Sequence, residues 1–464
     1  MTNTKSTDIR IRDVQIEFES HEYRSPIKFG GNVVRDVVLL NVQLSVENRT
    51  GQVATGQGSM PLGNVWAFPP IRVSPSESLA AMRELAHHEA DITRDFDQCA
   101  HPLDLSLQLE SKFLEAAQQL GQSVNLAEPV PKLAALVVSS PFDAALFDGF
   151  GKAAGFHAFH GLSSDYMAHD LSYYLNRDFK GQYLDQYVAD EPKSEIPLYH
   201  LVGALDPLTE EDDFEPVGDG LPETLSDWIR RDGLTHLKIK LNGDDLQWDV
   251  SRIVSVDAVA SQADQENQVR VSSVPSVGQR EWVYSLDFNE RAPNVEYLIE
   301  CLEKVKEQSS RAFERVAYVE QPTSRDLKAH PENKMHRAAA IKPVVIDESL
   351  VDFESLMLAR EQGYTGVALK ACKGQGQSLL MAAAAQHYGM FLCVQDLTCP
   401  GRSFVHSVGL AAWIGPVTAI EGNGRQYCPI ANATWEQSHP SIFVVEQGRV
   451  KTGDLDKPGL GIID

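Results

Sequence analysis

The sequence lacks the excess of positive charge that binding to nucleic acids and anionic membranes requires. Its 464 residues include 41 Lys and Arg against 65 Asp and Glu, which gives a formal net charge of −24 at pH 7. Proteins bind polyanions by releasing counterions to clustered Lys and Arg side chains. We therefore expect no nucleic-acid partner and no membrane partner.

Long apolar runs, a leader and paired cysteines are also missing. No apolar run approaches the roughly 18 residues of a membrane-spanning helix. The start, MTNTKSTDIRIRD, has no apolar stretch of the secretory type. The six cysteines are scattered without a CxxC pair, which is typical of reduced, mostly buried thiols. We expect a cytoplasmic protein.

The composition is that of a globular chain, since 43% of the residues are hydrophobic. The first part has a strand pattern at 37–47, a turn at 48–51, and helical patterns at 76–89, 103–120 and 140–154. Strands followed by helices, without alternation, predict an α+β domain.

From about residue 196 short apolar runs recur, each followed by a polar loop and a helical stretch. The eight runs are 197–204, 237–241, 284–289, 316–322, 344–349, 366–370, 390–396 and 418–423. Eight strands alternating with helices predict a parallel sheet, and eight is the number that closes a TIM-type barrel. An open doubly wound sheet is disfavoured, because no glycine-rich phosphate turn follows the first strand.

Two lysines lie on one face of the second of these strands. Lys238 and Lys240 are separated by one residue, so both side chains point to the same side. Burying two ammonium groups inside a barrel is costly unless they are paired or functional. The alternative is a charge pair on an edge strand.

Carboxylates end the next three strands, and a further lysine ends the strand after them. Asp287, Glu320 and Asp347 follow one another at about one βα unit each. The C-terminal strand ends form the active site in such barrels, so these groups should converge. They would repel one another unless a hard dication such as Mg²⁺ bound them. Lys370 ends the sixth strand, roughly across the barrel from the lysine pair.

In this order the motifs resemble those of the enolase superfamily, in particular the muconate-lactonizing-enzyme subgroup of the mandelate racemase/muconate lactonizing enzyme family. The motifs are KIK at 238–240, LDFNE at 286–290, VEQP at 319–322, IDES at 346–349 and ALKACKGQG at 368–376. The resemblance covers most of the chain and includes a helix at 140–155 similar to the family's link between its two domains.

The resemblance implies an α/β fold in which an N-terminal α+β capping domain covers a TIM-type (β/α)7β barrel. We place the capping domain at 1–165, the barrel at 166–430, and a C-terminal segment that returns to the cap at 431–464. A homo-oligomer is expected as well. The stretch 262–280 is expected to be an insertion.

The resemblance also implies that the three carboxylates bind Mg²⁺. Lys240 and Lys370 would be acid/base catalysts on the two faces of the substrate, with Lys238 lowering the pKa of Lys240. Removing a proton α to a carboxylate creates a dianionic enolate that a metal and nearby cations stabilise. We expect a small carboxylate substrate and racemisation, epimerisation or cycloisomerisation. The alternatives are a sugar-acid dehydratase and an inactive metabolite-binding barrel.

Other residues are weaker candidates. Glu421 ends the eighth strand, where relatives of this subgroup place a carboxylate that assists the enolate. The segments 23–31 and 56–69 are expected to be loops that close over the substrate. Candidate substrate contacts are Arg24, Lys28, Trp66, Asn289 and Asp396; for Arg24, Lys28 and Trp66 a surface role is the alternative, and for Asp396 a structural loop role.

Overall fold

Two sheets organise the chain. A computed structural model describes residues 4–29, 31–123, 125–270 and 281–462. A four-stranded antiparallel sheet has the order β3-β2-β1-β4, and a nine-stranded sheet has the order β12-β11-β10-β9-β8-β7-β6-β5-β13. Because β12 also pairs in parallel with β5, eight of those nine strands close into a barrel.

The barrel strands coincide with the eight expected runs. They are β5 (Glu195–Val202), β6 (His236–Lys240), β7 (Val283–Asp287), β8 (Val316–Glu320), β9 (Val344–Ile346), β10 (Gly366–Leu369), β11 (Phe391–Val394) and β12 (Ile420–Glu421). Small and aromatic side chains that include Tyr199, Tyr318 and Ala368 fill the interior below the site. The predicted TIM-type barrel with an N-terminal α+β cap is confirmed.

Helices follow most of these strands. They are α6 (Leu225–Asp232), α7 (Leu246–Arg270), α8 (Val295–Gln308), α9 (Ser310–Arg315), α10 (His336–Ala339), α11 (Phe353–Glu361), α12 (Gln375–His387) and α13 (Arg402–Trp413). Residues 262–270 of the expected insertion continue α7, and 271–280 lie outside the described residues.

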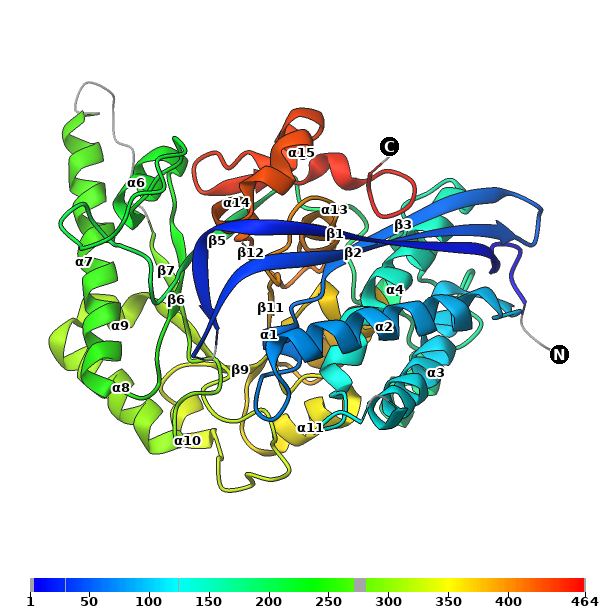
Figure 1. Ribbon diagram of the computed structural model, residues 1–464, viewed down its shortest axis with the longest axis horizontal. Helices are drawn as coiled ribbons and strands as arrows, with labels where there is room; N and C mark the ends of the chain where they lie inside the picture. The colour runs from blue at the N-terminus through cyan, green and yellow to red at the C-terminus, as the bar shows by residue number, and fades with distance from the viewer. Residues whose placement is uncertain (1–3, 30, 124, 271–280, 463–464) are drawn as a thin grey trace.

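The capping sheet consists of β1 (Ile9–Phe29), β2 (Asn32–Asn48), β3 (Val53–Pro61) and β4 (Cys99–Ala100). In Figure 1 the long β1–β2 hairpin, in blue, crosses the molecule beside α2 (Pro75–Arg94). The expectation of a loop at 23–31 is wrong for residues 23–29. Strand β1 runs through them: its pairing with β2 is interrupted after Glu22 and resumes at Ile27, and the mixed polar sequence hides the strand.

The expected loop at 56–69 is likewise part strand and part helix, because β3 extends to Pro61 and α1 covers Asn64–Ala67. The helix expected to begin at Ser76 starts at Pro75. Its N-cap is Ser74, whose side chain and that of Glu77 form a capping box. The other cap helices are α3 (Pro102–Ser123) and α4 (Lys132–Ala154).

The cap helix α4 is long and apolar enough to span a bilayer by length and composition, but 94% of its most apolar window is buried inside the protein. It packs directly on β3. A Cβ atom on Gly58 would lie 1.8 Å from the carbonyl oxygen of Pro141, so only glycine allows this approach. The cap core is thus built around one helix and one strand in backbone contact.

The C-terminal segment contacts both the barrel and the cap. Strand β13 (Arg449–Lys451) pairs antiparallel with β5, whereas Gly459 bridges to His157, and the Leu460 N–H donates to Asp148 of α4 at 2.9 Å. The domain boundaries at 165 and 430 stay predictions.

The remaining elements are α5 (Leu171–Tyr174), α14 (Gly424–Tyr427), α15 (Ala433–Ser438) and α16 (Pro440–Phe443), with short 3-10 turns at Ala158–Gly161, Arg177–Phe179, Leu184–Gln186, Ala371–Lys373, Pro429–Asn432 and Gly453–Leu455. All six cysteines are free thiols.

Candidate active site

The charged residues of the barrel motifs converge at the C-terminal ends of the strands. Lys240 of β6 lies beside Asp287 of β7, and Asp287 lies beside Glu320 of β8 in the strand register. Asp347 and Lys370 each follow their strand by one residue. The three carboxylates have no exposed surface, so the site is enclosed.

Lys238 lies at the centre of this group. Its Nζ atom is 3.0 Å from Asp287 Oδ2, 2.8 Å from Glu320 Oε1 and 2.8 Å from an oxygen of Glu421. Burial alone would lower the pKa of Lys238, but the three carboxylates outweigh it and raise that pKa well above its usual value. Lys238 is therefore charged at neutral pH and lies among carboxylates.

The two proposed acid/base lysines lie on opposite walls. Lys240 Nζ donates to Asp287 Oδ2 at 2.5 Å and to Asn289 Oδ1 at 2.9 Å, whereas Lys370 Nζ is 2.8 Å from Asp347 Oδ2. Their strands, β6 and β10, are four positions apart in a closed barrel of eight. A molecule bound between the walls would face one ammonium group on each side.

Asp347 is held by two lysines. Burial raises the pKa of a carboxyl group, yet Lys370 and Lys373 together lower the pKa of Asp347 to about 2. Burial lowers the pKa of Lys370 in turn, and Asp347 more than restores it, so that the pKa lies above its usual value. Both groups are thus charged at neutral pH in this arrangement.

Negative charge is in excess at the site. Six buried carboxyl groups face four buried ammonium groups; they are Asp287, Glu320, Asp347, Glu348, Asp396 and Glu421 against Lys238, Lys240, Lys370 and Lys373. Burial and the nearby Asp347 raise the pKa of Glu348 to about 7. Burial and Glu421 raise the pKa of Asp396 to the same value. Burial and Asp287 raise the pKa of Glu320 as well. A bound dication would favour the charged form of these carboxyl groups and so lower their pKa values.

The donor set fits a hard dication, although the carboxylates are not gathered around one point. Among the described residues, no three His, Cys, Asp or Glu side chains are close enough to hold a single ion. Lys238 lies between Asp287 and Glu320, and Lys370 is paired with Asp347. Buried oxygens of Glu348 and Asp396 lack a hydrogen-bond donor. Oxygen ligands with surplus negative charge are what Mg²⁺ prefers.

Comparison with known proteins rests on structure. No family model matches the sequence, and no curated protein matches it. The L-Ala-D/L-Glu epimerase of Bacillus subtilis matches with a TM-score of 0.62 at 16% identity, over 98% of this chain and 99% of that one. A dipeptide epimerase of Enterococcus faecalis complexed with Mg and L-Leu-L-Tyr gives 0.60 at 15% identity, over 98% and 100%.

The muconate lactonizing enzyme of Pseudomonas fluorescens, complexed with muconolactone, gives a TM-score of 0.59 at 15% identity, over 98% of this chain and 97% of that one. These likenesses span both the cap and the barrel. The chain shares the fold of these epimerases and of this lactonizing enzyme, a TIM-type barrel with an α+β cap. At these identities the likeness shows a shared fold, and the chemistry has to be argued from the site.

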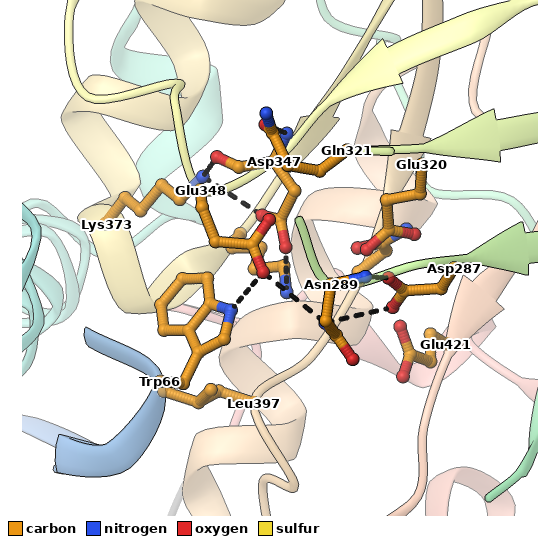
Figure 2. A network of polar contacts seen from close by, with 12 residues as sticks. Trp66, Asp287, Asn289, Glu320, Gln321, Asp347, Glu348, Lys373, Leu397 and Glu421 are labelled. Carbon is orange, nitrogen blue, oxygen red and sulfur yellow. Dashed lines mark hydrogen bonds and ion pairs between the residues drawn. The ribbon is translucent and has the colours of Figure 1, made fainter. Parts of the chain in front are cut away.

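The capping domain reaches the site through Trp66. Its indole N–H donates to Glu348 Oε1 at 2.9 Å (Figure 2). Its ring centre is 4.6 Å from Lys370 Nζ. Asn289 also lies in the site, where its backbone N–H donates to Asp287 Oδ1 at 2.8 Å. Asp396 accepts the backbone N–H groups of Cys399 and Asn423, at 3.0 and 3.3 Å.

Arg24 and Lys28 make their contacts away from the lysines and carboxylates at the ends of the barrel strands. The Arg24 guanidinium binds Asp219 at 2.6 Å and Glu223 at 3.3 Å, and Lys28 Nζ donates to Asn242 Oδ1 at 2.9 Å. Both cap residues thus hold the tip of the β1–β2 hairpin to barrel loops. Their role as substrate contacts stays a prediction.

Four residues of the site were missed by sequence reasoning: Gln321, Glu348, Lys373 and Gln395. Strand alternation places Glu348 on the outer face if β9 continues, but β9 ends at Ile346, so alternation no longer applies. Gln395 donates to Glu320, and Gln321 accepts backbone N–H groups beside Asp347. Gln321, Glu348 and Lys373 lie within the motifs VEQP, IDES and ALKACKGQG, and this position is the only sequence signal that they belong to the site.

Proposed function

We propose that the chain is a Mg²⁺-dependent member of the mandelate racemase/muconate lactonizing enzyme family of the enolase superfamily. It would remove the α-proton of a small carboxylate and complete a racemisation, epimerisation or cycloisomerisation. The observation that carries this proposal is the placement of Lys240 and Lys370 on opposite walls, with buried carboxylates between them. The shared fold, whose members include epimerases and a cycloisomerase, supports the reaction class.

Asp287, Glu320 and Asp347 would hold the Mg²⁺ ion. When bound, the ion supplies positive charge where negative charge develops on the substrate carboxylate. The surplus of buried carboxyl groups over ammonium groups in the site supports this assignment, as does the Mg bound to the Enterococcus faecalis epimerase of the same fold. Ion binding at this point requires Lys238 to withdraw from between Asp287 and Glu320.

The lysines would move the protons. For turnover, one of Lys240 and Lys370 would first release its proton to solvent. As a neutral amine it would accept the α-proton, and the other lysine, still charged, would donate a proton to the opposite face of the same carbon. Asn289 and Asp287 orient Lys240, while Asp347 orients Lys370. Burial excludes water, which strengthens the effect of each charge on the carbanion. Glu421 and Lys238 would adjust the charge beneath the substrate.

The test is exchange of the substrate α-proton with deuterium, followed by proton NMR in D₂O with Mg²⁺. The compounds are N-acyl amino acids, dipeptides, sugar acids and lactones. Lys240→Ala and Lys370→Ala should each lower the rate of exchange or turnover by about 10²–10⁴-fold, the usual contribution of one general acid or base. Lys451→Ala, which alters an exposed lysine, is the control.

Removal of Mg²⁺ by a chelator should abolish exchange, and added Mg²⁺ should restore it. Exchange that persists in Lys240→Ala and in Lys370→Ala would show that other groups move the proton. The absence of exchange across the whole series, with Mg²⁺ present, would favour the metabolite-binding alternative. Release of water from a sugar acid would identify a dehydratase instead.

A further inference from the structure

Trp66 belongs to the cap, yet its side chain contacts Lys370 on one wall of the barrel and is linked to Lys240 on the other wall through Glu348 and Asn289. We propose that Trp66 is a positioning residue that places Lys370 directly and Lys240 through Glu348 and Asn289. The acid/base pair would therefore be complete only when the cap is docked. This inference rests on the proposed function, because it assigns those two lysines their roles.

The indole ring covers the Lys370 side. The ring centre is 4.6 Å from Lys370 Nζ and 5.8 Å from Lys373 Nζ. An ammonium group over an aromatic face is attracted by the ring, and the attraction is strongest where water is excluded. Lys370 is almost fully buried. The ring and Asp347 thus hold the ammonium group from different directions.

The indole N–H begins a chain of hydrogen bonds that ends at Lys240. It donates to Glu348 Oε1 at 2.9 Å, and Asn289 Nδ2 lies 3.4 Å from the same oxygen. Asn289 Oδ1 then accepts a hydrogen bond from Lys240 Nζ at 2.9 Å. Figure 2 shows Trp66, Glu348 and Asn289 in this sequence. Each member is buried, so a lost bond is not replaced by water.

The backbone around Trp66 is fixed to the barrel. Arg325 donates to the Trp66 carbonyl oxygen at 3.0 Å, and Glu290 holds Arg325 by contacts of 2.8 Å. On the other side, a Cβ atom on Gly63 would lie 2.5 Å from Leu397, so α1 sits directly against the loop after β11. Helix α1 is therefore docked on two barrel loops.

Because of these contacts, the two lysines take up their positions only when α1 is docked on the barrel. If α1 left the barrel, Lys370 would lose the ring and Glu348 would lose the N–H donor at the same time. Asn289 would then contact a Glu348 side chain that Trp66 no longer holds, and it would hold Lys240 less firmly. The lysines are thus predicted to be most mobile and reactive when the cap is undocked.

Acylation of lysines by N-acetoxysuccinimide, followed by peptide mass spectrometry, tests this without any substrate or turnover. Trp66→Leu should raise the acylation rate of Lys370 roughly tenfold, since ring and cover are both lost. Trp66→Phe keeps a ring over Lys370 but lacks the N–H donor. It should protect Lys370 nearly as well as tryptophan does, while Lys240 reacts several-fold faster.

Trp248→Phe is the matched control, because Trp248 also faces a cation, Arg252 at 5.9 Å, away from the site. It should leave both site lysines as in the unaltered protein. Lys193, whose Nζ donates to backbone carbonyls at the end of α13, is the internal reference for general loosening.

Two results would overturn the proposal. One is unchanged acylation of Lys370 in Trp66→Leu. The other is an equal increase at Lys193 and Lys370, which would show that Trp66 only supports the fold. Neither depends on α-proton exchange, so failure of the proposed function would be seen separately. Where exchange is found, Trp66→Leu should lower kcat far more than it raises KM.

Discussion

Gln321 is an uncharged side chain among the carboxylates of the site. Its Oε1 atom accepts the backbone N–H groups of Asp347 at 3.0 Å and Ser349 at 3.2 Å, and its Nε2 atom donates to the Thr323 carbonyl at 3.1 Å. Its own φ angle is +27°, a value that non-glycine residues seldom adopt. At the residue scale, this one side chain fixes the turn that presents Asp347.

Gln321→Ala should lower the free energy of unfolding by about 2 kcal/mol, because two buried N–H groups lose their acceptor. It should also weaken Mg²⁺ binding, since Asp347 loses its support. Urea unfolding and calorimetric titration with Mg²⁺ measure the two effects. Gln377→Ala, which removes one half-buried bond to the Val351 carbonyl at 3.0 Å, should cost less than half as much and leave Mg²⁺ binding unchanged.

At the scale of elements, helix α4 and strand β3 come into backbone contact at glycines of β3. Cβ atoms on Gly56 and Gly58 would lie 2.0 Å from the Ala145 carbonyl oxygen and 1.8 Å from that of Pro141. Real Cβ atoms do not approach backbone atoms this closely, so any side chain pushes the strand off the helix. The capping sheet therefore depends on these two positions for its place against α4.

Gly58→Ala should lower the free energy of unfolding by about 3 kcal/mol or more, because the strand has to move. Gly409→Ala is the matched control. Gly409 lies inside α13, and a Cβ atom there would have no heavy atom of the surrounding structure within 4 Å, so alanine should be neutral or stabilising by up to about 1 kcal/mol. Urea unfolding measures both, and equal losses would contradict the packing argument.

Across the whole molecule, His157 links the end of the cap to the C-terminal segment and to the barrel. It bridges to Gly459, and its ring stacks on Trp413 of α13 with centres 4.3 Å apart. Its side chain accepts the Phe159 N–H at 3.1 Å, which requires a neutral ring. Burial, aided by nearby His160, lowers the pKa of His157 to about 3.

This shift makes stability depend on pH. The unfolded chain binds a proton at this histidine near pH 6.5, whereas the folded protein does so only near pH 3. Its contribution is therefore complete above pH 6.5 and is lost as the pH falls toward 3. Between pH 7 and pH 5, the unaltered protein should lose about 2 kcal/mol more unfolding free energy than His157→Asn.

Asparagine keeps an oxygen that can accept the Phe159 N–H but does not titrate in this range. Urea unfolding at several pH values gives the slopes for the two proteins. Parallel slopes would contradict a buried neutral His157.

Much of the barrel and the site could be predicted from the sequence. One strand ends in each βα unit, so the order of Lys240, Asp287 and Glu320 along the chain predicts that each lies at the end of a strand. The extent of β1 could not be predicted, because its pairing with β2 breaks after Glu22 and resumes only at Ile27 to Phe29. Glu348 was missed since its direction depends on where β9 stops.

The sequence by itself indicated an N-terminal α+β domain, eight strands alternating with helices, and the order of lysines and carboxylates at the strand ends; that the first domain caps the barrel was implied by the family resemblance. Local periodicity carries that information, because alternation and helical spacing are properties of neighbouring residues. Only the tertiary structure decided that Lys238 lies among three carboxylates, that Arg24 is turned toward Asp219, and that Trp66 joins both walls of the site. Those contacts join residues far apart in the chain, so no local pattern specifies them.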